Sequence, residues 1–519
     1  MKVIVEISVM PDFREEQLAN ELSLFCGCNI TSYSILRKSL DARKTVVYRY
    51  RCCVDIPPHV ATTLISSGKA LPYQEEEPVT IPYIKTTKRI PIVGCGPAGL
   101  FCALTLIEAG VAVDIYERGK ILAQRHRDVA MLREKGILDT NSNVVFGEGG
   151  AGTYSDGKLT TRIDKKEIKL FYDFMVRFGA PSSIVYEAKP HIGTDRLIGI
   201  IENIRNYIMQ KNSTIQFGKK LTDIFIDNNA LQGCCLNNNE EIVTDILVLA
   251  TGHSARDVYH LLHTKGIALQ KKGFAVGVRV EHPRELIDEI QYGRDKDTYG
   301  IYGAEYKLTY KDITGRGVYS FCMCPGGFII NSSSEEKRLC VNGMSYSKRN
   351  GASSNAALVV TVSQDDFMDI LDGINVQISL EEKAYQAGGG GFVAPAQRIT
   401  SFLQNSVDSS LPVCTYKPKV VASNFNAILP DAIREPLKRA IAHFGSRMKG
   451  FVTQEGILVG VETRTSSPVR IVRDESFQSI NCKGLYPVGE GAGYAGGIVS
   501  SAVDGIRAAQ KILTLLERM

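Results

Sequence analysis

Hydrophobic positions along the first eighty residues change period from strand to helix and back. Residues 2–9 alternate like a half-buried strand, and a helix capped by Asp12 is predicted to run to residue 24. Residues 32–40 and 45–54 predict two more strands. The stretch 74–82 carries three glutamates and two prolines and is typical of a linker.

Residues 89–119 have the order strand, glycine turn, helix, strand and acidic residue. In a dinucleotide-binding unit, Gly94 would permit a tight turn and Gly96 would let the backbone approach a pyrophosphate. Gly99 would let the helix pack on the sheet. Glu117 ends the second strand, where a carboxylate can accept hydrogen bonds from ribose hydroxyls. The segment therefore predicts a nucleotide site with the helix N-terminus facing the phosphates.

The rest of the chain divides by pattern into three stretches. Up to residue 252, helices and strands alternate, and the last apolar strand ends in Ala250-Thr251-Gly252. Residues 265–455 are strand-rich and lack helix–strand alternation, which favours an antiparallel sheet. A strand at 484–488, a glycine loop at 489–497 and a helix at 498–517 end the chain.

Composition narrows the class of protein. A chain of 519 residues with 44% hydrophobic and 23% charged residues predicts two or three globular domains. The net charge of +5 is too small to indicate nucleic acid by itself. No apolar run is long enough to span a membrane, and the N-terminus lacks the pattern of a signal peptide. Thirteen cysteines, an odd number, argue against a disulfide framework, so a cytoplasmic location is expected.

The glycine turn with Glu117, the apolar strand TDILVLATG and the late segment LYPVGEGAGYAGGIVSSAVDGI together resemble the FAD proteins of the glutathione-reductase superfamily. More narrowly, the chain is similar to a family of bacterial and plastid FAD-dependent dehydrogenases described as NAD-utilising. That similarity is carried by YSILRKSLDARK, FGEGGAGTYSDGKLTTR, KPHIGTDRL, VGVRVEHP, FCMCPGG and GVETRTSSPVRI.

The resemblance implies an α/β fold in which a Rossmann-like FAD-binding domain is split in sequence. Its first part would be residues 87–264 and its second part residues 455–519. An inserted antiparallel β-rich cap or substrate domain would occupy residues 265–454. A small N-terminal α+β domain, ferredoxin-like in arrangement, would occupy residues 1–86.

The same resemblance implies where FAD would be held. The helix beginning at Gly497 and Ile498 would face the flavin, Glu490 would bind the ribityl chain, and backbone near Leu221 would hold the adenine. The glycines at 149–152 would approach the isoalloxazine. The full set of expected cofactor residues is Gly94, Gly96, Pro97, Ala98, Gly99, Glu117, Arg118, Arg125, Gly149, Gly150, Ala151, Gly152, Leu221, Ala250, Thr251, Gly252, Gly489, Glu490, Gly497 and Ile498.

Candidate catalytic residues each have a second interpretation. Cys322 and Cys324 could be redox-active or nucleophilic, or could simply pack in a strand, and no second ligand pair supports a metal site. Arg464 and Arg470 could clamp an anionic substrate or form ordinary ion pairs with Glu462 or Asp474.

Three further sets of charged residues also have two possible roles each. Lys158 and Asp156 could handle protons beside the flavin. Arg118 and Arg125 could cover the adenosine or lie on a solvated helix face, and His253 could contact FAD or solvent. A basic hairpin in the N-terminal domain could face an anionic partner or another domain. It contains a single acidic residue, Asp41, and six basic residues: Arg37, Lys38, Arg43, Lys44, Arg49 and Arg51.

The function these observations predict is an FAD-dependent oxidoreductase that passes hydride through a non-covalently bound flavin. NAD(P)H is a candidate transient donor and the substrate is a small molecule that the sequence does not name. One alternative is an RNA-modifying flavoprotein, supported by the basic hairpin. The other is an FAD-binding redox sensor without turnover. The sequence indicates no membrane partner and leaves the oligomeric state open.

Overall fold

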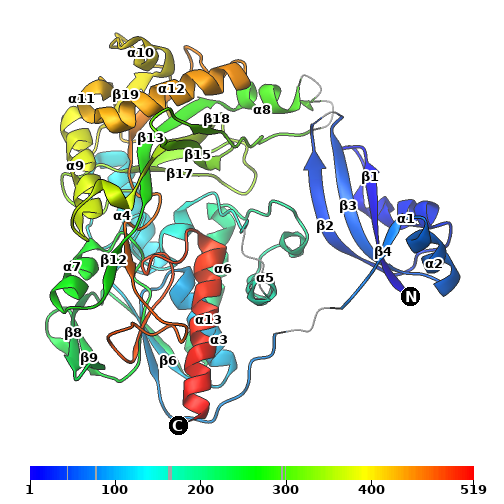
Figure 1. Cartoon of the computed structure of the whole chain (residues 1–519), viewed down its shortest axis with the longest axis horizontal. Coiled ribbons are helices and arrows are strands. Elements are labelled where there is room, and N and C mark those ends of the chain that lie inside the picture. Colours follow the sequence, from blue (N-terminus) through cyan, green and yellow to red (C-terminus); the bar gives the residue numbers. More distant parts are fainter. Residues whose placement is uncertain (44, 76–78, 162–165, 294–295, 298–299, 519) are drawn as a thin grey trace.

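Figure 1 shows the computed structural model of the chain, which describes residues 1–43, 45–75, 79–161, 166–293, 296–297 and 300–518. The N-terminal unit lies to one side of the main body, and an extended segment joins the two. In the main body, a unit built on a parallel sheet lies below a larger antiparallel sheet (Figure 1). Within the described ranges, no helix is both long and apolar enough to cross a membrane.

The N-terminal unit is a four-stranded antiparallel sheet with two helices, in the split βαβ order β2-β3-β1-β4. Its elements are β1 (Lys2–Val9), α1 (Leu18–Cys26), β2 (Tyr33–Asp41), β3 (Val47–Asp55), α2 (Pro58–Ser66) and β4 (Ala70–Pro72). The N-cap predicted at Asp12 is wrong. The amide of Phe13 donates to Met10 in a turn, so Asp12 precedes the helical segment, whose first turn at Glu15–Gln17 is capped by Arg14.

The parallel sheet has five strands in the order β23-β11-β5-β6-β7. They are β5 (Ile90–Val93), β6 (Val113–Glu117), β7 (Thr214–Phe217), β11 (Leu247–Leu249) and β23 (Leu485–Pro487). The chain winds from β5 outward through β6 and β7, and later returns to the other side of β5. The strand order therefore reverses between β5 and β11, the position at which open α/β sheets bind ligands.

Two helices that are far apart in sequence pack closely together on this sheet (Figure 1). They are α3 (Pro97–Glu108) and α13 (Ile498–Glu517). Gly505 makes the contact possible, because a Cβ at that position would lie 2.1 Å from the carbonyl oxygen of Ala98. The last predicted helix, 498–517, forms as expected, and its N-terminal half lies against the start of α3, beside the first glycine turn.

The remaining elements of this lower unit flank the sheet. Among them, a three-stranded antiparallel sheet of order β10-β9-β8 follows β7. The flanking elements are α4 (Leu122–Lys135), α5 (Glu167–Arg177), α6 (Thr194–Gln210), β8 (Leu221–Asp227), β9 (Ala230–Leu236), β10 (Glu240–Val243) and α7 (Arg256–Thr264). The helix α5 belongs to the stretch before residue 252 in which the sequence predicts alternating helices and strands.

The upper unit is built on a seven-stranded sheet of order β14-β15-β18-β13-β21-β19-β20, with helix α12 lying across it (Figure 1). Neighbouring strands are antiparallel except β19 and β20. The strands are β13 (Phe274–Pro283), β14 (Thr309–Lys311), β15 (Gly317–Cys324), β18 (Ser353–Val362), β19 (Ala394–Arg398), β20 (Val420–Ala422) and β21 (Ile457–Glu462). The helices are α8 (Arg284–Tyr292), α9 (Asp372–Ala387), α10 (Ile399–Gln404), α11 (Phe425–Ile428) and α12 (Asp431–Arg447).

Two small strand pairs join the layers. β16 (Phe328–Asn331) pairs with β17 (Val341–Met344), and β12 (Leu269–Lys271) pairs with β22 (Val469–Ile471). The boundary expected at residues 454/455 falls too early, because β21 hydrogen-bonds to β13 and β19 inside the upper sheet. The buried run Ile457–Glu462 suits a central strand, and the chain leaves that sheet only after it.

Candidate functional site

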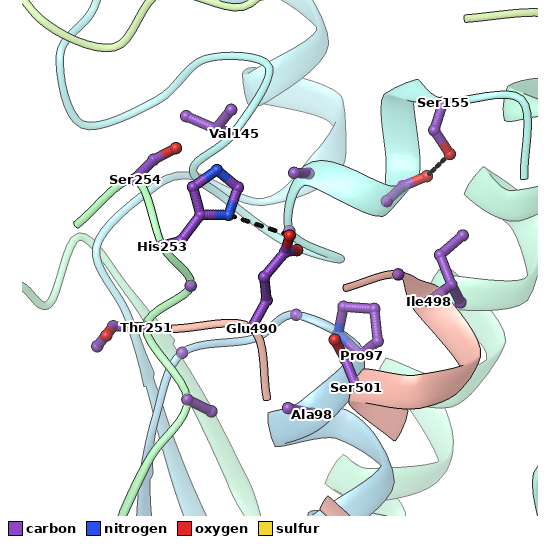
Figure 2. Close-up of a pocket in the computed structure, with 18 of the residues that line it drawn as sticks. Pro97, Ala98, Val145, Ser155, Thr251, His253, Ser254, Glu490, Ile498 and Ser501 are labelled. Carbon is purple, nitrogen blue, oxygen red and sulfur yellow. Dashed lines mark hydrogen bonds and ion pairs between the residues drawn. The ribbon is translucent and has the colours of Figure 1, made fainter. Parts of the chain in front are cut away.

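A cavity of about 550 Å³ opens at the carboxyl ends of β5 and β11, beneath the upper sheet. Its walls come from five stretches that are distant in sequence: 93–98, 116–118, 150–161, 250–254 and 488–501. Residues of the upper unit close one side, among them Phe321, Cys322, Asn342 and Thr465. Figure 2 shows the part of this space where Pro97, His253, Glu490 and Ile498 meet.

Glycines let the turns around this cavity approach one another. Gly94 has φ +108°, and a Cβ there would lie 2.3 Å from the carbonyl oxygen of Ala250. A Cβ on Gly150, at φ +64°, would lie 2.9 Å from the Cα of Gly96. A side chain at either position would force the two turns apart. By contrast, a Cβ on Gly252 or Gly496 meets nothing within 4 Å.

Two long helices begin at the cavity wall. The N-cap of α3 is Gly96 and that of α13 is Gly497, and neither makes a side-chain hydrogen bond to its helix. The first backbone N–H groups of a helix have no partner within it and carry a partial positive charge. Both helix ends are therefore suited to oxygen-rich or anionic groups in the cavity.

Glu117 is buried at the cavity and already accepts backbone hydrogen bonds. Its carboxylate takes N–H groups from Cys95, Gly119 and Gly147, each at 2.9 Å. One side chain thus ties the first glycine turn to the loop that follows α4. A carboxylate has about four lone-pair sites, so acceptor capacity remains for a ligand hydroxyl.

Arg118 lies in the wall of the same end of the cavity. Its guanidinium carbon is 4.3 Å from the centre of the Phe146 ring, and its Nη2 is 2.9 Å from Asp257. The ion pair and the ring hold the arginine as a flat surface beside Leu221. Such a surface can stack on a planar base.

Arg125 was expected either at the adenosine or in solvent, and the structure places it in neither position. It is fully buried behind the glycine loop. Its guanidinium donates to four backbone carbonyls, those of Asn143, Val144, Glu148 and Gly150. The physical reason is that this loop is rich in glycine and turns, so its carbonyls lack strand or helix partners and need a multidentate donor.

His253 and Glu490 point toward each other and are in contact at the cavity (Figure 2). His253 Nδ1 is 3.4 Å from Glu490 Oε1. His253 Nε2 is buried and has no hydrogen-bond partner among the described residues. Buried polar atoms are nearly always satisfied, so this nitrogen marks a place where a ligand atom would complete the site.

Lys158 is held in a network of charges at the edge of the cavity. Its Nζ lies 2.9 Å from both Asp156 Oδ2 and Glu305 Oε1, and Arg349 pairs with the same two carboxylates. Burial has the largest single effect on the pKa of Lys158 and lowers it, but the negative charges around the ammonium, chiefly Asp156 and Glu305, together outweigh burial, and the net shift is upward. The pKa of Asp156 is lowered by Lys158 and Arg349 against its burial. Both groups stay ionised near neutral pH, so they supply fixed charge and are poorly suited to proton transfer.

Arg464 contributes to the cavity wall, but its guanidinium is engaged elsewhere. Glu381 binds it through two contacts of 3.0 and 2.9 Å, and Ser334 accepts a further hydrogen bond. Glu381 also binds Arg256, which joins the two units. The expected partners were wrong, because Glu462 pairs instead with Arg279.

Six of the expected residues do not line the cavity. Gly99, Gly149 and Gly489 pack behind it, and the Cβ of a residue replacing Gly489 would lie 2.7 Å from Ala98 Cβ. Cys324 is fully buried while Cys322 lines the wall. The other residues outside the lining are Arg125 and Arg470.

The other expected residues meet at one cavity. They are Gly94, Gly96, Pro97, Ala98, Glu117, Arg118, Gly150, Ala151, Gly152, Lys158, Leu221, Ala250, Thr251, Gly252, Arg464, Glu490, Gly497 and Ile498. The sequence analysis did not single out several lining residues, namely Val145, Phe146, Ser254, Phe321, Asn342 and Thr465, although Phe146, Phe321 and Thr465 lie within its quoted segments. Phe146 begins the glycine-rich loop, and that position is the one available signal for it.

A Clostridium beijerinckii protein described as "Uncharacterized protein" is 42% identical over 495 residues, covering 93% of each chain. Residues 273–465 match the family model "FAD-dependent protein, C-terminal domain-like". The chain belongs to the same family as the Clostridium protein, and the matched segment supports FAD as the cofactor.

Solved structures give looser likenesses. A flavin-dependent brominase Bmp2 mutant shares 12% identity at a TM-score of 0.37, over 83% of this chain and 81% of that one. A geranylgeranyl bacteriochlorophyll reductase-like protein from Thermoplasma acidophilum gives 12% and 0.37, over 83% and 79%. At these TM-scores the likeness carries no weight for fold or function.

Proposed function

We propose that this protein is an FAD-dependent oxidoreductase that binds its flavin non-covalently in the cavity between the two units. The observation that carries the proposal is the convergence of two uncapped helix N-termini and several glycine turns on one cavity of about 550 Å³. Its volume lies in the range of cofactor sites. The glycine contacts and the unpartnered nitrogen of His253 fit a ligand with phosphate and hydroxyl oxygens.

The chain's residues divide into an adenosine end and a flavin end. Glu117, Arg118 and Leu221 would hold the adenosine, with Glu117 accepting from the ribose. The start of α3, at Gly96 and Pro97, would hold the pyrophosphate. His253 Nε2 would meet the hydroxyl-bearing chain that links the two ends of FAD. The contact between His253 and Glu490 supports this position for the chain.

At the other end, residues 150–152 and the N-terminus of α13 would contact the isoalloxazine. When bound, the flavin supplies hydride-transfer chemistry that no protein side chain supplies. The partial positive charge at the N-terminus of α13 and the ammonium of Lys158 favour negative charge in this part of the cavity. The upper unit covers this part of the cavity through Phe321 and Asn342, which would shield the reacting face from water.

The substrate would be a small molecule that enters beneath the upper sheet. NAD(P)H is the proposed hydride donor and would bind transiently at the flavin face. The chain carries one dinucleotide unit in sequence, at residues 89–119, and FAD would occupy it.

The basic hairpin does not favour the RNA-modifying alternative. Asp41 pairs with Arg43 and Arg49, and Lys38 pairs with Glu15. The backbone of Lys38 also hydrogen-bonds to residues 186 and 188 of the lower unit. Lys44 lies outside the described residues. Three of the six basic residues are thus paired within the chain, and part of the hairpin forms a contact between units.

Anaerobic mixing of the flavin-loaded protein with NADH or NADPH tests the hydride-donor part of this proposal. We expect bleaching of the flavin absorbance by at least one of the two, at a rate that saturates with donor concentration. Failure of both donors to reduce a flavin that dithionite reduces would refute NAD(P)H as the donor, while leaving the flavin assignment intact.

A further inference from the structure

Strand β15 is distorted where it reaches the cavity. Its pairing with β18 shifts register between Phe321 and Cys324, so the strand carries a bulge there. Cys322 sits in the bulge with φ +43°, a left-handed conformation that non-glycine residues rarely adopt. Bulges commonly re-aim a side chain next to a functional site, and this one places Cys322 in the cavity wall.

The bulge also brings a second sulfur beside the first residue. Cys324 Sγ lies 3.4 Å from the carbonyl oxygen of Cys322. In an undistorted strand, the side chains of residues 322 and 324 would point to the same face of the sheet. Here Cys322 lines the cavity, and Cys324 is fully buried directly behind it. Both are free thiols in this structure.

Arg279 supports the pair from behind. Its side chain is fully buried, and its Nη2 lies 2.6 Å from the Cys322 carbonyl oxygen and 3.4 Å from Cys324 Sγ. Glu462 and Asn355 bind the rest of the guanidinium at 2.7 Å each. A buried arginine with these partners holds both the bulged backbone and the inner sulfur in place.

The electrostatics separate the two thiols. A hydrogen bond from Cys324 lowers the pKa of Cys322, and the charges of Arg279 and Lys158 lower it further against burial. The pKa of Cys324 is raised by the same pairing and by burial. Elsewhere, burial raises the pKa of cysteines such as Cys102 and Cys234. The cavity-facing thiol thus has the more thiolate character, as an attacking sulfur requires.

We propose that Cys322 and Cys324 form a redox dithiol that exchanges two electrons with the flavin bound in this cavity. The proposal rests on the proposed function, because the flavin is the electron partner. When the dithiol is oxidised, a bond forms between the two sulfurs, and both thiol protons leave. The two electrons and one proton pass to FAD, giving the anionic reduced flavin, and the second proton goes to solvent. Reduction of the disulfide by reduced flavin follows the reverse path.

An anaerobic reductive titration of the air-oxidised, FAD-loaded protein tests this exchange. A disulfide is a two-electron couple, so the wild type should consume two electrons per flavin beyond those the flavin takes. Cys322→Ser and Cys324→Ser should each consume only the flavin's share. Cys28→Ser, a half-buried cysteine of the N-terminal unit, is the matched control and should titrate like the wild type.

Peptide mapping supplies a readout that does not depend on activity. Cleavage after Arg316 and Lys337 releases residues 317–337, which contain both cysteines and no others. From the oxidised protein this peptide should be lighter by two hydrogens and resist alkylation. After reduction through the flavin, both of its sulfurs should alkylate.

The outcomes separate the two proposals. An FAD-loaded wild type that titrates like Cys322→Ser, with an alkylatable peptide in air, overturns the dithiol and leaves the proposed function standing. A protein that takes up no FAD overturns the proposed function, and the exchange with it. Should Cys324→Ser lose FAD because its site is buried, Cys322→Ser still decides, since Cys322 lies at the cavity wall.

Discussion

Replacing Arg125 by alanine removes a donor that the glycine loop cannot replace from within. The guanidinium binds the carbonyls of Asn143 and Val144 at 2.8 Å, that of Gly150 at 2.9 Å and that of Glu148 at 2.5 Å. A buried carbonyl left without a donor costs about 1–3 kcal/mol. Water can enter the space left by the side chain, so the low end applies, and four carbonyls sum to about 4 kcal/mol.

That cost falls on the loop whose residues 150–152 line the cavity. If all of it opposes the bound state, FAD affinity falls by at most about a thousandfold, since each 1.4 kcal/mol is a factor of about ten. We expect a loss between tenfold and that limit for Arg125→Ala. Arg125→Lys keeps the charge but not the planar set of donors, and should lie between alanine and wild type.

The assay is a titration of the apoprotein with FAD, followed by flavin fluorescence, together with the urea midpoint for FAD release. Arg127→Ala is the matched control, because Arg127 lies on the same helix and is exposed. An Arg125→Ala protein whose FAD dissociation constant and urea midpoint match those of Arg127→Ala would refute the role given to Arg125.

Three further perturbations test other parts of the structure. Gly505→Val should separate α3 from α13, because even a Cβ would lie 2.1 Å from Ala98 O, and should lower the melting temperature by several degrees; an unchanged melting curve would contradict that packing. A chain lacking residues 1–79 should still bind FAD, because among the described residues none before Val93 lines the cavity, and a soluble truncated protein without FAD affinity would show otherwise. Burial raises the pKa of Glu281 to about 7, so the folded protein favours the protonated carboxyl. The resulting contribution to the free energy of unfolding is complete below about pH 4.5 and is lost as the pH rises through 7. Relative to Glu281→Gln, the wild type should therefore lose about 2.5 kcal/mol of unfolding free energy between pH 5 and 8, and parallel stability–pH curves would contradict the shift.

Local patterns predicted the lower unit because its signals are short-range. The glycine turn, the strand before it and the terminal helix each occupy one continuous stretch, and α13 begins and ends where the hydrophobic pattern does. The separation of Gly94 from Ala250 in sequence did not matter, since both follow buried parallel strands whose carboxyl ends share one edge.

Long-range pairings explain what the sequence did not reveal. Arg464 finds Glu381, which lies 83 residues away on α9, and no spacing rule links them. Arg125 lies on a helix rich in charged residues, a pattern typical of an exposed face, yet it is fully buried because the loop folds over it. The orientation of Cys322 follows from a β-bulge, and the sequence of a strand alone does not predict where a bulge forms.

Identification of the cofactor tests the central claim most directly. The purified protein, saturated with a mixture of FAD and FMN and then freed of excess, is heated, and the released flavin is identified and counted against the chain. FMN lacks the adenosine that Glu117, Arg118 and Leu221 are proposed to hold at one end of the cavity, so FMN would leave that end unfilled. We predict one FAD per chain, released by heat without a covalent remnant. Release of FMN in comparable amount, or of no flavin at all, would contradict the account.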